Sequence, residues 1–189
     1  IGYPLKGYRW RASVSKLGLG IFGDVDILRV SGMYSHYFDL GKGFYFASAV
    51  NGYISTPRFQ PYANFRGLGY NQLWLRGYEL DVIEGQGYVL QQNTISKRLF
   101  ATEFDMSRII PIDQFNVIPL SIYIKGYVDQ GFVSNTIEYE QSDRLSNQYL
   151  MGYGLGIDIV TFYDTVFRLE RSWKIDGTAG FFVHFRSAF

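Results

Sequence analysis

The chain has 189 residues and a formal net charge of only +1, so it shows no basic surplus that would indicate a nucleic-acid-binding surface. No run approaches the roughly 20 apolar residues of a membrane-spanning helix, and the absence of cysteine excludes disulfides and thiolate metal sites. A mean hydropathy of -0.05 with 16 Tyr and 16 Phe instead fits a barrel that needs aromatic rings at both bilayer interfaces and a polar interior.

The first three predicted strands precede a long irregular stretch. Residues 8 to 15 alternate apolar with polar side chains over about one membrane crossing. A second alternating strand runs to near Phe38, a tight hairpin turn is predicted at 39 to 42, and a third strand spans about 44 to 54. Each strand would present one face to lipid and the other to water.

Residues 55 to 87 lack a clean alternation, and Pro57, Pro61 and several glycines interrupt any regular pairing. A loop of this length usually has a function. We expect it to fold back into the lumen of the barrel.

The strands after the loop are predicted at 88 to 106, 120 to 129, 150 to 162, 165 to 175 and 180 to 189. The two faces of the strand at 88 to 106 cannot be told apart, and Lys97 is placed near an interface, where it can snorkel. The total is about eight antiparallel strands, each near the length of a tilted crossing, which predicts an all-β transmembrane barrel.

Strand parity assigns the connections to two sides. With Phe189 at the periplasmic rim, as is usual for such barrels, the loops at 55 to 87, 134 to 148 and 176 to 180 lie outside. The turns at 39 to 42, 107 to 116 and 163 to 164 then lie on the periplasmic side. Because exported proteins begin with a signal peptide, we expect the protein to start upstream of Ile1.

The irregular stretch contains Leu75, Arg76, Gly77 and Tyr78 in succession. This tetrapeptide resembles the Val-Arg-Gly-Phe/Tyr motif of the BamA/TamA superfamily, the outer-membrane barrels that insert other barrels or carry polypeptide across the membrane. The resemblance implies an extracellular loop that tucks into the lumen and whose arginine pairs with acidic residues on the barrel wall. The alternative interpretation of Arg76 is a solvated loop arginine.

A second stretch, with Tyr127, Asp129 and Gly131, resembles the partner motif of that family, aromatic-x-Asp-x-Gly. Alternation alone places Asp129 on the polar face, and the resemblance implies an ion pair with Arg76. The family usually has an inward glutamate on the strand after the loop, where this chain has Asn, Thr, Ile, Ser and Lys at 93 to 97. We therefore expect one ion pair to hold the loop.

The terminal strand resembles the aromatic C-terminal insertion signal of such barrels and, in this family, half of a weak seam between the first and last strands. The residues concerned are Gly180, Phe181, Val183, Phe185 and Phe189. The resemblance covers nearly the whole chain but only the C-terminal half of a roughly sixteen-stranded barrel. The sequence around these motifs is most similar to that of a Bacteroidota branch of the family. Some members of this branch carry a carboxypeptidase-regulatory-like domain at the N-terminus.

The resemblance implies an integral protein of the bacterial outer membrane that inserts and assembles β-barrel proteins or translocates polypeptide, without a cofactor. Its partners would be outer-membrane lipids and lipopolysaccharide, unfolded outer-membrane clients and other subunits of an assembly complex. Two alternatives remain open: a passive pore or receptor barrel, and a structural subunit of an outer-membrane complex without insertase activity.

An enzyme is not predicted. The chain has two histidines, His36 and His184, and each is interpreted as a structural residue. We also predict no metal site, because the loop carboxylates that could form one lack ligand-like spacing. These carboxylates are Asp24, Asp26 and Asp143.

Glycines at 152, 154 and 156 alternate with apolar residues, which indicates a strand and not a phosphate-binding loop. The inner face of this strand would be bare. It would leave room for the folded-in loop or for a kink in the strand.

Overall fold

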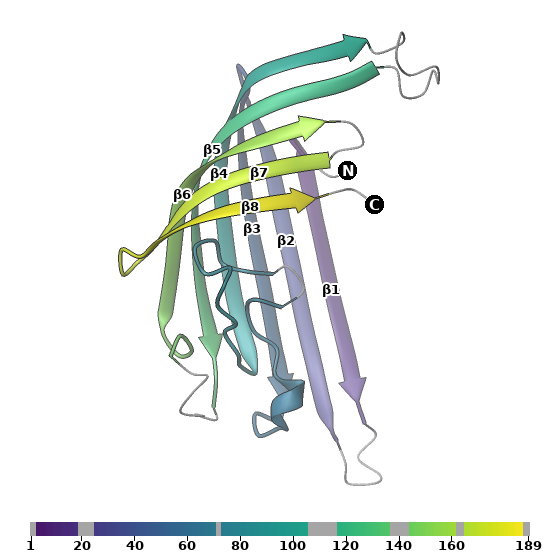
Figure 1. Cartoon of the computed structure of the whole chain (residues 1–189). Coiled ribbons are helices and arrows are strands. Elements are labelled where there is room, and N and C mark those ends of the chain that lie inside the picture. The colour runs from purple at the N-terminus through teal and green to yellow at the C-terminus, as the bar shows by residue number, and fades with distance from the viewer. Residues whose placement is uncertain are drawn as a thin grey trace.

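The computed structural model describes residues 3–18, 25–70, 73–105, 117–136, 144–161 and 165–186. These residues form one sheet of eight antiparallel strands that follow one another in chain order (Figure 1). The strands are β1 (Gly7–Leu17), β2 (Ile27–Gly41), β3 (Phe44–Thr56), β4 (Gly87–Asp105), β5 (Val117–Ser134), β6 (Tyr149–Thr161), β7 (Thr165–Lys174) and β8 (Ala179–Arg186). The prediction of an all-β antiparallel fold is confirmed.

Within the described residues the only helical element is a 3-10 turn, Tyr62–Asn64. No described helix is long and apolar enough to cross a membrane.

The sheet is strongly curved but open (Figure 1). Among the described residues β1 pairs only with β2 and β8 only with β7, so these two strands are its edges. Curvature brings distant strands face to face. As a result, residues of β2, β3, β7 and β8 line a common cavity. We call the hollow side of the sheet the concave face and the other side the convex face.

The strands alternate between these two faces. On β6, Ile157 is 41% exposed on the convex face, whereas its neighbour Asp158 is 1% exposed on the concave face. Opposite Ile157 lie Ile124 of β5 and Leu169 of β7, which are also exposed. In this part of the sheet, apolar side chains thus face outward, and the charged side chain of Asp158 is buried in the hollow.

The hairpin between β2 and β3 lies two residues later than predicted. β2 continues to Gly41, and the turn consists of Lys42 and Gly43, whose φ angles are 53° and 79°. Two positive φ angles are the signature of the turn whose twist matches a hairpin. The prediction of a turn at 39 to 42 was wrong because β2 contains an irregularity between Asp39 and Gly41, which continues the strand.

β4 contains a bulge that explains why its faces are ambiguous in the sequence. The register with β5 shifts between Arg98 and Phe100, with Leu99 as the extra residue. Lys97 lies opposite Ile124, and Phe100 lies opposite Ile122, so residues of opposite parity share the convex face on the two sides of the bulge. Lys97 lies on the convex face, with its Nζ 4.8 Å from the ring centre of Phe44.

The long loop separates β3 from β4, and its described residues, 57–70 and 73–86, lie along the hollow of the sheet (Figure 1). An antiparallel bridge between Leu68 and Ile83 draws its two arms together. The main apolar core of the described residues lies between this loop and β4, β5 and β6, and consists of Leu68, Leu75, Tyr78, Ile83, Leu90, Val133 and Leu150. The predicted connections at 107 to 116 and 163 to 164, and residues 137 to 143 of the predicted loop at 134 to 148, lie outside the described residues.

Candidate functional site

Arg76 lies at the inner end of the loop, where it meets the wall of the sheet. Its side chain binds Asp129 of β5 in a two-pronged geometry: Nε donates to Oδ2 at 2.8 Å and Nη2 donates to Oδ1 at 2.5 Å. The backbone N–H of Arg76 also donates to Asp129 Oδ2, at 3.2 Å. Arg76 is 6% exposed and Asp129 is fully buried, so the fork is a desolvated ion pair.

The surroundings of Arg76 are assembled from three strands. The guanidinium carbon lies 4.0 Å from the ring centre of Tyr127 on β5, a cation–π contact, and Nη2 donates to Thr94 Oγ1 of β4 at 3.0 Å. Glu170 of β7 places Oε1 3.9 Å from Nη1. The strand after the loop thus contributes a neutral hydroxyl, and the second carboxylate near Arg76 comes from β7.

Glycines allow the loop to approach the sheet this closely. A Cβ on Gly152 of β6 would lie 1.8 Å from the carbonyl oxygen of Arg76, and a Cβ on Gly131 would lie 2.8 Å from Leu75 Cδ1. The prediction that the bare inner face of this strand leaves room for the loop is confirmed at Gly152. Gly77 has a φ of 97°, which a residue with a side chain rarely adopts.

The other two motif residues anchor the loop by packing. Leu75 is fully buried in the apolar core, and Tyr78 is 3% exposed beside it. Lys174 of β7 places Nζ 4.7 Å from the Tyr78 ring centre and 2.7 Å from Asp81 Oδ2. The motif therefore contacts β5, β6 and β7 together.

Further along the loop, Tyr70 donates to Glu84 Oε1 at 2.5 Å. Burial, reinforced by this carboxylate, raises the pKa of Tyr70 to about 12. The phenol therefore stays protonated at neutral pH and remains a donor. This bond lies within the loop and helps to fix its shape.

The residues predicted at the C-terminus form the exposed edge of the sheet. Phe181, Val183 and Phe185 are 68%, 63% and 63% exposed on the convex face of β8, and Gly180 pairs with Ser172 of β7. Phe189 lies outside the described residues. The edge strand thus presents aromatic and branched side chains outward.

A second ionic cluster lies beside the fork, and no local sequence pattern marks its members as a unit. Lys125 Nζ is 2.7 Å from Asp158 Oδ1 and 2.8 Å from Glu170 Oε1, and Arg168 Nε donates to Asp158 Oδ1 at 3.1 Å. Lys125, Asp158 and Glu170 are each at most 3% exposed. The sequence indicates only that these residues lie on the polar faces of successive strands. Which of them come together depends on the registers of β5 with β6 and of β6 with β7.

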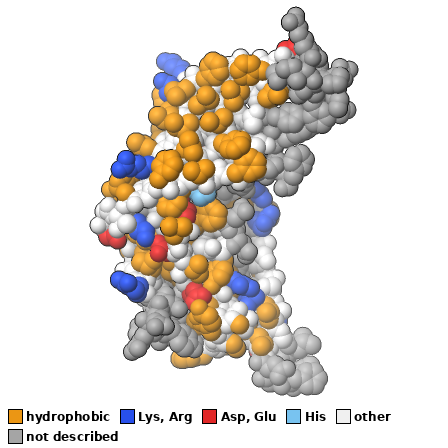
Figure 2. Space-filling view, in the orientation of Figure 1, with side chains coloured by type: hydrophobic (Ala, Val, Ile, Leu, Met, Phe, Trp, Pro, Cys, Tyr) orange, Lys and Arg blue, Asp and Glu red, His pale blue; other side chains and the backbone are white. Residues whose placement is uncertain are grey.

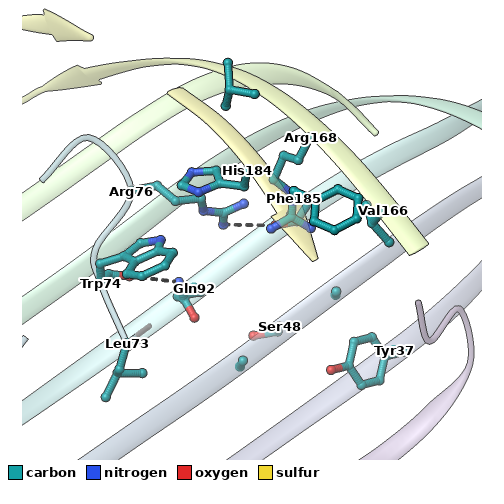
Figure 3. Close-up of a pocket in the computed structure, with 14 residues that line it drawn as sticks. Tyr37, Ser48, Leu73, Trp74, Arg76, Gln92, Val166, Arg168, His184 and Phe185 are labelled. Carbon is teal, nitrogen blue, oxygen red and sulfur yellow. Dashed lines mark hydrogen bonds between the residues drawn. The ribbon is translucent and has the colours of Figure 1, made fainter. Parts of the chain in front are cut away.

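A cavity of about 430 Å³ lies next to the fork, between the loop and the strands that face each other across the hollow (Figure 3). Its lining includes Trp74 and Arg76 of the loop, Gln92 of β4, Arg168 of β7 and His184 of β8. Gln92 donates to Asp129 Oδ2 at 3.2 Å, which connects the cavity wall to the fork.

The two histidines occupy different faces. The ring of His36 stacks on that of Phe38 with 4.0 Å between the ring centres, and His36 Nδ1 lies 3.0 Å from the Tyr34 hydroxyl oxygen. Both partners belong to an exposed aromatic group on β2. His184 instead points into the hollow, where its ring stacks on Trp74 at 5.4 Å (Figure 3).

Together these features define a class of structure: a curved, open antiparallel sheet with a long loop fastened to its concave face by a buried arginine. Comparison of the chain with models of known families, with curated proteins and with solved structures finds no match.

Proposed function

We propose that this chain is the C-terminal half of a roughly sixteen-stranded outer-membrane barrel of the BamA/TamA kind. The complete barrel would insert and assemble other β-barrel proteins or translocate polypeptide. The observation that carries this proposal is the Arg76–Asp129 fork, which joins two motif positions 53 residues apart through a loop that lies on the concave face. A solvated loop arginine would not be 6% exposed with a carboxylate in fork geometry.

The convex face supports a membrane location. Figure 2 shows hydrophobic side chains gathered where β7 and β8 cross the upper half of the view, and the exposed apolar residues there include Phe167, Phe181, Val183 and Phe185. Water-soluble monomers rarely expose continuous apolar surface of this kind, whereas a barrel in lipid requires it. Arg171 interrupts this face, and its guanidinium lies 5.3 Å from the Trp173 ring centre.

The edge of β8 supports an insertion mechanism. An unpaired edge offers backbone N–H and C=O groups to an incoming strand, which can add to the sheet without any side-chain chemistry. The fastened loop would keep the lumen filled while this edge opens. Partners would be outer-membrane lipids and lipopolysaccharide, unfolded barrel clients and other subunits of an assembly complex; no catalytic residue or cofactor is needed.

Depletion of the complete protein in the bacterium that makes it tests this proposal. An insertase should lower the amounts of many unrelated outer-membrane barrels together, and an Asp129→Asn copy should restore them less well than the wild type. Loss of one solute's uptake, combined with a large steady conductance of the purified protein, would instead establish a passive pore or receptor. Loss of a single complex with normal barrel levels would establish a structural subunit.

A further inference from the structure

Three polar side chains from three separate segments meet next to the fork: Glu79 of the loop, Glu170 of β7 and His184 of β8. His184 Nε2 lies 3.5 Å from Glu170 Oε2 and 3.7 Å from Glu79 Oε1. All three candidate ligand atoms lie within 4.8 Å of one another.

These atoms are buried but not satisfied. The side chains of Glu170 and Glu79 are 1% and 5% exposed. Glu79 Oε1, Glu170 Oε2 and His184 Nε2 are shielded from solvent and have no hydrogen-bond partner among the described residues. Their separations exceed the range of about 2.7–3.2 Å for such bonds. Burying carboxylate oxygens in this state is unfavourable unless another group binds them.

The distances from His184 Nε2 to the two carboxylate oxygens suit ligands of one metal ion better than direct hydrogen bonds. Zinc binds imidazole nitrogen and carboxylate oxygen at about 2.0–2.2 Å in tetrahedral geometry, which separates neighbouring ligand atoms by roughly 3.3–3.6 Å. The two distances from His184 Nε2, 3.5 Å and 3.7 Å, are close to that range.

Neighbouring groups hold both carboxylates in position while leaving one oxygen of each free. Glu79 Oε2 accepts the backbone N–H of Gly77 at 2.9 Å, and Glu170 Oε1 lies 2.8 Å from Lys125 Nζ. Trp74 stacks on the imidazole of His184 at an interplanar angle of 16°. Such outer contacts are what orient the ligands in protein metal sites.

The charges of the surrounding cluster favour a cation. Four carboxylates face three basic side chains, a formal excess of one negative charge. The carboxylates are Glu79, Asp129, Asp158 and Glu170, and the basic groups are Arg76, Lys125 and Arg168.

We propose that Glu79, Glu170 and His184 form a binding site for one divalent transition-metal ion, for which Zn²⁺ is the best match. One nitrogen and two oxygen ligands favour Zn²⁺ over Mg²⁺ or Ca²⁺, which prefer oxygen alone. The ion reaches the site through the cavity, whose lining includes His184. It ties the loop directly to the last two strands, a fastening that is separate from the Arg76–Asp129 fork and independent of the proposed function.

Zinc binding to the complete protein, purified in detergent without a histidine tag and stripped with a chelator, tests the proposal. We expect one high-affinity Zn²⁺ per chain by calorimetry and metal analysis, and no comparable binding of Mg²⁺. Outer contacts alone change metal affinity by about 10–100-fold, so removing a ligand should weaken binding by at least about 100-fold. Glu79→Gln and His184→Gln each remove one ligand, whereas His36→Gln, the matched control, should bind Zn²⁺ normally.

Zinc should also slow tryptic cleavage after Arg76 in the wild type but not in Glu79→Gln, because the ion holds Glu79 against β7 and β8. Glu79 lies on the loop, so its variant tests the site without altering a strand. Two results would overturn the proposal: no tight Zn²⁺ binding to the wild type, or binding that is unchanged in both ligand variants.

Discussion

Arg76 illustrates how one buried charge can fix the position of a long loop. A buried ion pair adds little net stability compared with an apolar pair of the same size, but removing one partner leaves an uncompensated charge. The fork with Asp129, the ring of Tyr127 and the hydroxyl of Thr94 all require Arg76 in one place. The contact therefore specifies a single position of the loop on the sheet.

Replacing Asp129 with asparagine keeps the shape of the side chain but removes its charge. Loss of one member of a buried pair costs about 3–5 kcal/mol, so the loop should detach at least about a hundredfold more often. Because Arg76 is itself a trypsin site and is 6% exposed, detachment makes it cleavable. We expect limited proteolysis of the complete protein in detergent to cut after Arg76 much faster in Asp129→Asn than in the wild type.

Asp81→Asn is the matched control for this experiment. Asp81 also pairs with a basic side chain on the sheet, Lys174, at 2.7 Å, but its side chain is 31% exposed. Exposed pairs contribute about 0.2–1 kcal/mol, so the cleavage rate should change only slightly. Equal cleavage rates after Arg76 in Asp129→Asn and Asp81→Asn would show that the fork does not hold the loop.

Gly152→Ala adds a single methyl group where the loop backbone touches β6. The new carbon would lie 1.8 Å from the carbonyl oxygen of Arg76, and neither backbone can yield without moving the loop. Overpacking of this kind typically costs about 1–3 kcal/mol. We expect a lower urea midpoint and faster cleavage after Arg76. In the control Gly32→Ala on β2, the new carbon meets nothing within 4 Å, so the urea midpoint and the cleavage rate should stay unchanged. A Gly152→Ala protein with the wild-type midpoint and cleavage rate would contradict the close approach of loop and strand.

At the scale of single residues, the sequence identifies only part of the site. Asp129 can be inferred because strand alternation and motif resemblance point to the same residue. The roles of Glu170 and Glu79 cannot be inferred from the sequence. Their proximity to the fork depends on the register of β7 and on the path of the loop. Neither is encoded by local periodicity.

At the scale of elements, strands with regular alternation are predictable and irregular ones are not. β6 and β7 lie within one residue of their predicted bounds, because residues of alternating character run along most of each strand. β4 could be placed but its faces could not, since the bulge at Leu99 reverses the parity without a distinctive residue. The predicted hairpin at 39 to 42 was displaced for a similar reason, the irregularity before Gly41.

The edge strand β8 should be the least protected part of the sheet if it forms a seam. Within the described residues β8 pairs only with β7, whereas β5 pairs on both sides. We expect hydrogen–deuterium exchange of the complete protein in lipid to be faster in β8 than in β5, because weakly paired backbone groups open locally.

β1 is the internal control for that measurement. It is also an edge among the described residues, but in a larger barrel it would pair with a preceding strand and exchange as slowly as β5. Fast exchange in both β1 and β8 would argue against a larger closed sheet. Slow exchange in β8 would argue against the seam.

At the scale of the whole molecule, the arrangement of polarity is inverted relative to a water-soluble domain. Charged residues such as Asp158 and Glu170 are buried on the concave face, and large apolar residues such as Ile157 and Phe181 are exposed on the convex face. Composition alone indicates this inversion, because aromatic content is high while mean hydropathy is near zero. The fastening of the loop depends on contacts between segments far apart in the chain and is visible only in the folded molecule.

Ile157→Arg tests whether lipid covers the convex face. Ile157 lies opposite Ile124 and Leu169, so a new arginine there would have only apolar neighbours across the strands. Arginine at the bilayer midplane of a barrel costs about 2–4 kcal/mol, and less near the interfaces. We expect a lower urea midpoint of the complete protein in lipid vesicles. Leu80→Arg, on the loop and 89% exposed, should have no such effect. If both variants unfold at the wild-type midpoint, the convex face is in water and the membrane proposal fails.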